Sequence, residues 1–344
     1  MNATVQTLVF STKEWQGRYW SRDIPNGVET VPYTSGVFIV PADGSAPPRK
    51  VIDVEGKGDF PGFSPDGAWV YFQAPQASRA RIFRCREDGS ELQDITAAHT
   101  PPGDRYGYKL SRDGTRVLFT HHDGRIGRVG IMNPDGSAPR LIAPDIGYHY
   151  MADISPDNRR VVFAHTARGY ILTLKHLESG EMRVLTPDHP ESFCPQFTPD
   201  GKTILFTRRD GDVYRVAAEG GDLRRLTHGN DYITFYLSPE DRHGSSDFPS
   251  LSPDGRQIAY VARKDGIPQV HVMDTDGRNA RQVTFRQTPC GRAAFSPDGR
   301  RVAFVSWEGL HTQLFVIPAE GGEPTKLTDV QGAVYFLNWK PGPG

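Results

Sequence analysis

The stretch FSPDGRRVAF, residues 295–304, decides the fold, because near copies of it recur along the chain of 344 residues. The other copies are FSPDGAWVYF (63–72), LSRDGTRVLF (110–119), ISPDNRRVVF (154–163), FTPDGKTILF (197–206) and LSPDGRQIAY (251–260). Successive copies lie 47, 44, 43, 54 and 44 residues apart. A period of about 40–50 residues is typical of a propeller blade with four strands.

Each repeat predicts the same series of strands. An apolar strand leads into a Ser-Pro-Asp-Gly turn, and an alternating strand follows it. A third strand such as QLFVIP (313–318), a second glycine-rich turn and a short strand such as TKLT (325–328) complete the unit. The second turn occurs seven times, whereas the opening phrase occurs six times.

The chain ends explain this mismatch. The C-terminal VYFLNWKPG (334–342) resembles an opening strand, and nothing like a later strand follows it. The N-terminal TLVFST (7–12) and GVFIVPADGSAPPRKVI (36–52) resemble the later strands. We therefore predict an all-β, seven-bladed β-propeller that is closed by pairing of the C-terminal strand with the N-terminal blade. Closure of this kind removes free sheet edges.

The whole chain, 1–344, is predicted to form this single propeller. The expected blades are about 1–52 plus 331–340, 59–96, 106–142, 150–186, 193–227, 247–284 and 291–328. At this level of detail the chain resembles the TolB-like β-propeller repeat family, whose mark is the Ser-Pro-Asp-Gly hairpin. The resemblance implies a propeller over nearly the whole chain. It does not select an activity, because members include binding modules, peptidase-associated propellers and polysaccharide lyases.

The repeated aspartates are predicted to build turns and not to perform chemistry. In 63–72, Pro65 pre-sets φ, Asp66 follows, and Gly67 takes the position where a left-handed conformation is easy. Asn158 replaces this glycine in one copy, and asparagine tolerates the same conformation. No further metal ligands recur at fixed offsets from the aspartates.

Composition excludes several classes of function. The formal net charge is -1, so no overall basic field favours nucleic acid or an anionic membrane. Cys85, Cys194 and Cys290 lie far apart, which argues against a disulfide framework or a structural zinc site, and we expect buried thiols. Neither a signal-peptide pattern nor an apolar run of 18 residues is present, so we expect a cytoplasmic protein, or a periplasmic one if a signal peptide had been removed.

A binding site is predicted on the face that carries the loops between blades, because these loops are longer and richer in aromatic and charged residues than the short turns. Aromatic rings beside arginines suit a polar, anionic ligand such as an oligosaccharide. A central pocket lined by Lys109, Asp153, Gln196 and Asn338 is expected, since these residues directly precede opening strands. Further ligand-binding candidates are Trp20, Arg105, Tyr108, Tyr236, Arg292 and Trp307.

An enzyme is the first alternative. The chain lacks GxSxG, GxxxxGK[ST] and HExxH motifs. It resembles, more distantly, the seven-bladed oligogalacturonate lyases, which implies abstraction of a proton beside a uronate carboxylate. The metal ligands of that family do not match here, so no ligand set can be read for a divalent metal and the cofactor is open. The candidates for a metal-independent lyase are Tyr148, His149, Arg242 and His243. A non-catalytic scaffold that binds a protein partner is the second alternative.

Overall fold

The computed structural model describes residues 5–15, 33–54, 59–77, 79–99, 102–143, 149–166, 169–230, 249–263, 266–309 and 311–342. Every regular element in these ranges is a β-strand. Within the same ranges, no helix has the length and apolar character needed to cross a membrane. The predicted all-β class is therefore confirmed.

Five four-stranded antiparallel sheets follow one another along the described chain. The first contains β4 (Asp59–Phe63), β5 (Val70–Gln76), β6 (Arg79–Cys85) and β7 (Gln93–Asp94). The second contains β8 (Asp104–Leu110), β9 (Val117–His122), β10 (Gly127–Met132) and β11 (Arg140–Leu141). The third contains β12 (His149–Ile154), β13 (Arg160–His165), β14 (Ile171–His176) and β15 (Met182–Val184). The fourth contains β16 (Ser192–Phe197), β17 (Thr203–Arg208), β18 (Val213–Ala217) and β19 (Arg224–Arg225). The fifth contains β20 (Ser250–Leu251), β21 (Gln257–Ala262), β22 (Gln269–Asp274) and β23 (Arg281–Gln282).

The remaining strands form an eight-stranded sheet that joins the two ends of the described chain. One part of it contains β24 (Cys290–Phe295), β25 (Arg301–Glu308), β26 (His311–Pro318) and β27 (Thr325–Lys326). The other part contains β28 (Ala333–Trp339), β1 (Thr7–Trp15), β2 (Tyr33–Pro41) and β3 (Arg49–Val54). β28 runs antiparallel to β1 and pairs Trp339 with Leu8. A single parallel pair, Thr312 with Ala333, joins the two parts.

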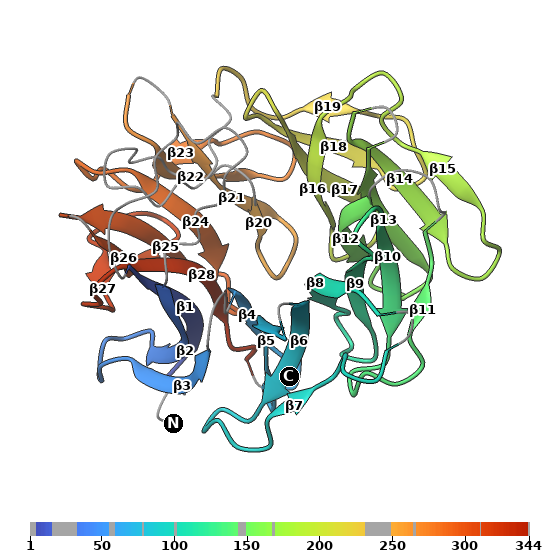
Figure 1. Ribbon diagram of the computed structural model, residues 1–344. Helices are drawn as coiled ribbons and strands as arrows, with labels where there is room; N and C mark the ends of the chain where they lie inside the picture. Colours follow the sequence, from blue (N-terminus) through green and yellow to red (C-terminus); the bar gives the residue numbers. More distant parts are fainter. Residues whose placement is uncertain are drawn as a thin grey trace.

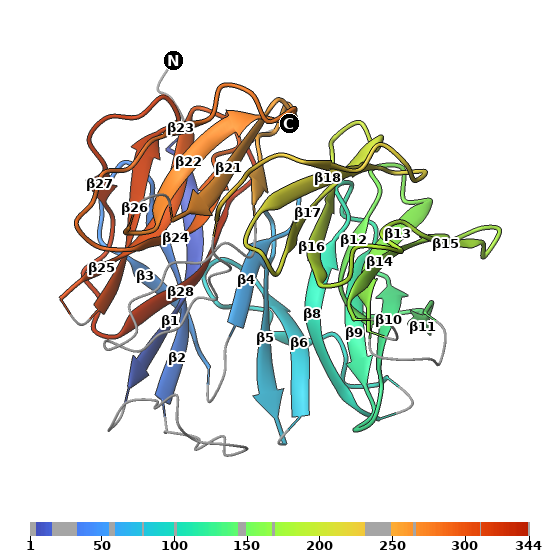
Figure 2. The ribbon, with the colours of Figure 1, turned by 90° about the horizontal axis from the view of Figure 1, so that it is seen from above.

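The sheets stand side by side in a ring, with β4, β8, β12, β16, β20, β24 and β28 nearest its axis (Figure 1). Seen after a quarter turn, β1 and β28 lie next to each other, although they come from opposite ends of the sequence (Figure 2). This arrangement is that of a β-propeller, in which each sheet is a blade.

The repeated motif forms its turn through local hydrogen bonds. In the copy at 251–260, Ser252 Oγ donates to Asp254 Oδ1 at 2.6 Å, and the same oxygen accepts the N–H of Arg256 at 3.0 Å. These bonds lower the pKa of the Asp254 carboxyl. Gly255 has φ = +71°, and Asn158 has φ = +57° at the equivalent position. Each of the six repeated aspartates accepts such a hydroxyl bond, which confirms the predicted turn-building role.

The motif turns of neighbouring blades pack against one another. A Cβ added to Gly255 would lie 2.8 Å from Pro199 of the preceding turn. Equivalent neighbours are Gly114 with Pro65, Gly201 with Pro156 and Gly299 with Pro253. Where Arg112 replaces the proline, Asn158 Nδ2 donates to Asp113 Oδ2 at 2.6 Å instead. The two departures from the motif are thus neighbours in space, and a hydrogen bond takes the place of the glycine–proline contact.

Apolar side chains fill the spaces between the blades. One cluster packs Val270 and Val272 of β22 against Phe304 of β25 and Phe315 of β26. Complete burial of a valine or phenylalanine side chain stabilises a fold by roughly 1.5–3 kcal/mol. The core therefore lies between sheets, and it holds the inner strands in fixed positions around the axis.

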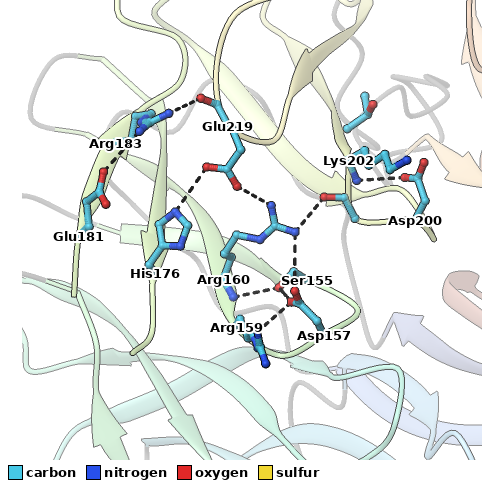
Figure 3. A network of polar contacts seen from close by, with 12 residues as sticks. Ser155, Asp157, Arg159, Arg160, His176, Glu181, Arg183, Asp200, Lys202 and Glu219 are labelled. Atoms are coloured by element: carbon cyan, nitrogen blue, oxygen red, sulfur yellow. Dashed lines mark hydrogen bonds and ion pairs between the residues drawn. The ribbon is translucent and has the colours of Figure 1, made fainter. Parts of the chain in front are cut away.

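Polar contacts also join neighbouring blades, on the face of the propeller that carries the turns. Figure 3 shows Glu219, in the turn after β18, between Arg160 of β13, His176 of β14 and Arg183 of β15. Arg160 Nη1 donates to Glu219 Oε1 at 2.7 Å, and His176 Nε2 lies 3.5 Å from Oε2. Arg183 Nη1 donates to the Glu219 carbonyl oxygen at 2.5 Å. The third and fourth blades are therefore joined by charged groups as well as by their apolar faces.

Candidate functional site

Seven residues occupy equivalent positions on the inner strands, and we call them the inner ring. The members of the inner ring are Gly62, Lys109, Asp153, Gln196, Ser250, Ala294 and Asn338. In the six blades that carry the motif, each member pairs with the ninth residue of the motif copy, for example Lys109 with Leu118. The four polar residues predicted to line one pocket therefore lie at the same level around the axis.

The pair Lys109 and Asp153 is the charged part of the inner ring. Lys109 Nζ lies 3.8 Å from Asp153 Oδ1, and the lysine side chain is 48% exposed. Asp153 is buried, and its Oδ2 accepts the N–H of Phe197 in the next blade at 2.8 Å. Ser250 Oγ accepts the N–H of Phe295 in the same way at 3.1 Å. Asp153 therefore joins two blades, while Lys109 reaches solvent.

Asn338 lies on the other side of Gly62 from Lys109. An added Cβ on Gly62 would lie 3.3 Å from Asn338 Nδ2 and 3.4 Å from the Tyr108 hydroxyl, so glycine leaves room for both polar groups. The Tyr108 hydroxyl is 2.5 Å from the carbonyl oxygen of Phe60 and 2.9 Å from that of Tyr71. Burial raises the pKa of Tyr108 well above its usual value. Tyr108 thus holds the neighbouring blade, and the exposed Asn338 amide is a second polar group near the axis.

A β-bulge precedes the inner ring in most described inner strands, and its first residue has a positive φ. These bulge residues are Phe60 (φ 56°), Gly107 (φ 60°), Met151 (φ 53°), Cys194 (φ 52°) and Arg292 (φ 54°). Four of them are not glycine, and a left-handed conformation costs such a residue roughly 1–3 kcal/mol. Strained positions of this kind cluster at functional sites, and bulges often redirect side chains there.

The bulge residues contact one another between blades. The ring centroids of Phe60 and Phe336 are 3.8 Å apart, and the Arg292 guanidinium lies 4.3 Å from the centroid of Phe336. Cys194 Sγ lies 3.3 Å from Met151 Sδ. The bulges therefore gather an aromatic–cationic group and a sulfur pair at the inner strands.

The other predicted site residues differ in exposure. Arg105 and Trp307 are each 2% exposed, so their side chains are almost completely buried. Gln196 is half-buried in the inner ring. His149 begins β12, but its side chain lies outside what the structure describes. Trp20, Tyr148, Tyr236, Arg242 and His243 also lie outside the described residues.

The bulge residues Phe60 and Met151, and Phe336 beside them, were missed by the sequence analysis, and Cys194 was treated only as a buried thiol. Its burial is confirmed, at 4% exposure, and none of the three cysteines forms a disulfide. The sequence does contain a signal, because each bulge residue stands two positions before a member of the inner ring. Among the described residues, no group of three or more His, Cys, Asp or Glu side chains is placed to hold a metal ion.

The comparisons with known proteins agree with the propeller fold. The family model described as the TolB beta propeller domain matches residues 240–341. The Tol-Pal system protein TolB of Anaeromyxobacter dehalogenans is 26% identical over 178 residues, which are 50% of this chain and 38% of that protein. The structure of TolB from Acinetobacter baumannii superposes with a TM-score of 0.57 at 18% identity, over 98% of this chain and 67% of that one. The chain therefore has a TolB-like β-propeller fold.

A further relative of this TolB-like propeller is an uncharacterized protein of Agrobacterium fabrum, 30% identical over 125 residues. The match covers 34% of this chain and 35% of that protein. The TolB-like propeller therefore spans little more than a third of the length of the curated relatives that it matches. Likeness to the solved structure, at 18% identity, concerns the fold alone.

Proposed function

We propose that this TolB-like propeller binds a polar, anionic small molecule or oligosaccharide at its axis, around the inner ring. The observation that carries the proposal is the exposed Lys109, the cationic member of the inner ring. Asp153 accepts a backbone N–H, and its contact with Lys109 is long at 3.8 Å, so the ammonium group keeps donors for a carboxylate or phosphate. The exposed Asn338 amide supplies further donors near by.

Trigalacturonate is a suitable probe, because it presents carboxylates on sugar rings, and neutral galactotriose is its matched control. We expect trigalacturonate to raise the melting temperature of the wild-type chain. At about 100 times the dissociation constant, a ligand stabilises the folded state by roughly 2.7 kcal/mol. Lys109→Met keeps the length of the side chain and removes its charge, so it should weaken binding by about tenfold or more, measured by calorimetry.

Lys202→Met is the control variant, since Lys202 is an exposed lysine that follows a motif turn and does not belong to the inner ring. It should bind trigalacturonate as the wild type does. The proposal is overturned if galactotriose binds equally well, or if Lys109→Met leaves the affinity unchanged. The lyase alternative, with Tyr148, His149, Arg242 and His243 as candidates, is tested in the same incubations by following the formation of an unsaturated product.

A second candidate function is docking of a protein partner around the inner ring. It is favoured by the relative named Tol-Pal system protein TolB. A protein partner should depend on a broad set of residues, whereas a small anion should depend mainly on Lys109. Two results together would favour a protein partner over a small anion. The Lys109→Met variant would still co-purify with the partner, and no acidic probe would bind the wild-type chain.

We also propose that the platform for this site is a single, closed propeller of seven blades. The pairing of β28 with β1 supports closure, and one apolar cluster packs Leu8 and Phe10 of β1 against Val305 of β25. The first motif turn, at Gly67, also packs against the C-terminal segment. A Cβ added to Gly67 would lie 3.1 Å from the side chain of Lys340, which directly follows β28. Deletion of residues 333–342 should therefore leave one edge of β1 unpaired, with β2 still on its other edge, and abolish cooperative unfolding.

A further inference from the structure

We propose that Met151 and Cys194 form a two-sulfur binding site for copper(I). The two residues are the bulge residues of adjacent inner strands, β12 and β16, and their sulfur atoms are 3.3 Å apart. Cys194 is 4% exposed, and Met151 is half-buried. This site goes beyond the proposed binding of an anion, because it uses neither Lys109 nor Asn338.

The bulges bring the two sulfur atoms together. Met151 and Cys194 have φ of 53° and 52°, as the equivalent bulge residues Phe60 and Arg292 also have a positive φ. This shared backbone conformation belongs to the repeat, whereas the two sulfur atoms are particular to these two adjacent blades. Their contact places two soft sulfur atoms side by side.

The other two cysteines provide an internal contrast. Cys290 belongs to an apolar cluster, and three oxygen atoms lie near its Sγ, namely Gln269 Oε1 at 3.7 Å, Ser306 Oγ at 3.8 Å and the Thr288 carbonyl at 3.9 Å. Cys85 belongs to an apolar cluster, and burial raises its pKa to about 11. Among the three cysteines, the thioether contact is thus found for Cys194.

Two sulfur ligands select a soft cation. Thiolate and thioether groups favour copper(I) over hard ions such as magnesium or calcium. On binding, the metal ion replaces the proton of the Cys194 thiol, and this proton passes to solvent. With two metal–sulfur bonds of about 2.3 Å, a two-coordinate, near-linear site requires the sulfur atoms to stand about 4.6 Å apart. The separation must increase from 3.3 Å by about 1.3 Å, which the flexible methionine side chain allows.

The test is an anaerobic titration of the full chain with copper(I) held by a chromophoric chelator. We expect the wild type to withdraw about one copper(I) ion per chain from the chelator. Met151→Leu conserves volume and apolar packing but removes the thioether. It should weaken copper(I) binding by about tenfold or more, and Cys194→Ser should weaken it at least as much.

Cys290→Ser is the matched control, because it removes a buried thiol that has no thioether neighbour, and it should bind copper(I) like the wild type. Thermal unfolding of each variant checks that it is folded. If Cys194→Ser does not fold, the copper(I) affinity of Met151→Leu alone tests the proposal. Absence of copper(I) uptake by the wild type would overturn the proposal. Uptake that survives Met151→Leu but not Cys194→Ser would also overturn it, since the site would then be a single thiol. Lys109→Met should take up copper(I) normally, so the two proposed sites fail independently.

Discussion

Asp212 shows how one carboxylate joins two strands of a blade. It is completely buried at the start of β18. Its Oδ2 accepts hydrogen bonds from Arg225 of β19, and its Oδ1 accepts one from Thr227 Oγ1 at 2.7 Å. Thr227 Oγ1 in turn accepts the N–H of Val213 at 2.9 Å. The hydrogen bond to this carboxylate raises the pKa of Arg225, so the guanidinium keeps its charge.

Replacement of Asp212 by asparagine should therefore destabilise the fold. Loss of one partner from a fully buried ion pair costs about 3–5 kcal/mol, and the partial exposure of Arg225 reduces this to about 2 kcal/mol here. Denaturant unfolding measures the change. Asp222→Asn is the control, because Asp222 pairs with Arg224 on the exposed surface, where solvent screens the pair, and the change should affect stability far less. Equal effects of the two changes would refute this account of Asp212.

Turns decide how closely the blades approach each other. Gly136 lies in the second turn of its blade, with φ = +86°, and an added Cβ would stand 1.9 Å from the carbonyl oxygen of Ile95 in the preceding blade. Gly89 has the same relation to Val51, at 2.4 Å. Gly180, in the second turn of another blade, has φ = +75° but no atom within 4 Å of the added Cβ.

These two environments predict different costs for the same substitution. Gly180→Ala meets backbone strain alone and should destabilise the fold by about 1 kcal/mol. Gly136→Ala meets the same strain and a backbone collision, which only separation of the blades can relieve, so we expect a loss of more than about 3 kcal/mol. Thermal unfolding of the two variants checks the difference. Similar losses would mean that the blades can move apart more easily than their packing indicates.

The repeated turn gives the whole molecule a common response to acid. A hydroxyl hydrogen bond, followed by a backbone N–H, lowers the pKa of Asp66, Asp200 and Asp254 below the usual 3.8. The unfolded chain therefore binds more protons than the folded chain in the acid range. The stability contributed by these carboxylates is complete above pH 3.8 and is lost as the pH falls through the lowered pKa values.

We expect the melting temperature to fall steadily when the pH is lowered from about 5 toward 2. The side chain of asparagine does not titrate, so Asp254→Asn should show a shallower fall than the wild type. Calorimetry at a series of pH values measures both slopes. A melting temperature that is constant or rises in this range would contradict the prediction.

The sequence by itself determined the repeat, the all-β class and the chemistry of the turns, because these depend on bonds between residues close together in the chain. Ser252, Asp254 and Gly255 form their turn within a few positions, so the order of residues is sufficient to predict it. The positions of the inner ring also followed from the sequence. Lys109 stands one residue before a copy of the motif, and Asn338 stands one residue before Trp339, which takes the place of the first motif residue.

Only the tertiary structure decided which side chains meet near the axis. Met151 and Cys194 are 43 residues apart, and their contact depends on the β-bulges, the register and the packing of two blades together. Asp153 became a link between blades through a backbone N–H of Phe197, which no residue pattern identifies. The burial of Arg105 and Trp307 likewise depends on how the blades pack. Turns follow from local hydrogen bonds, whereas the site depends on contacts between blades that the order of residues does not encode locally.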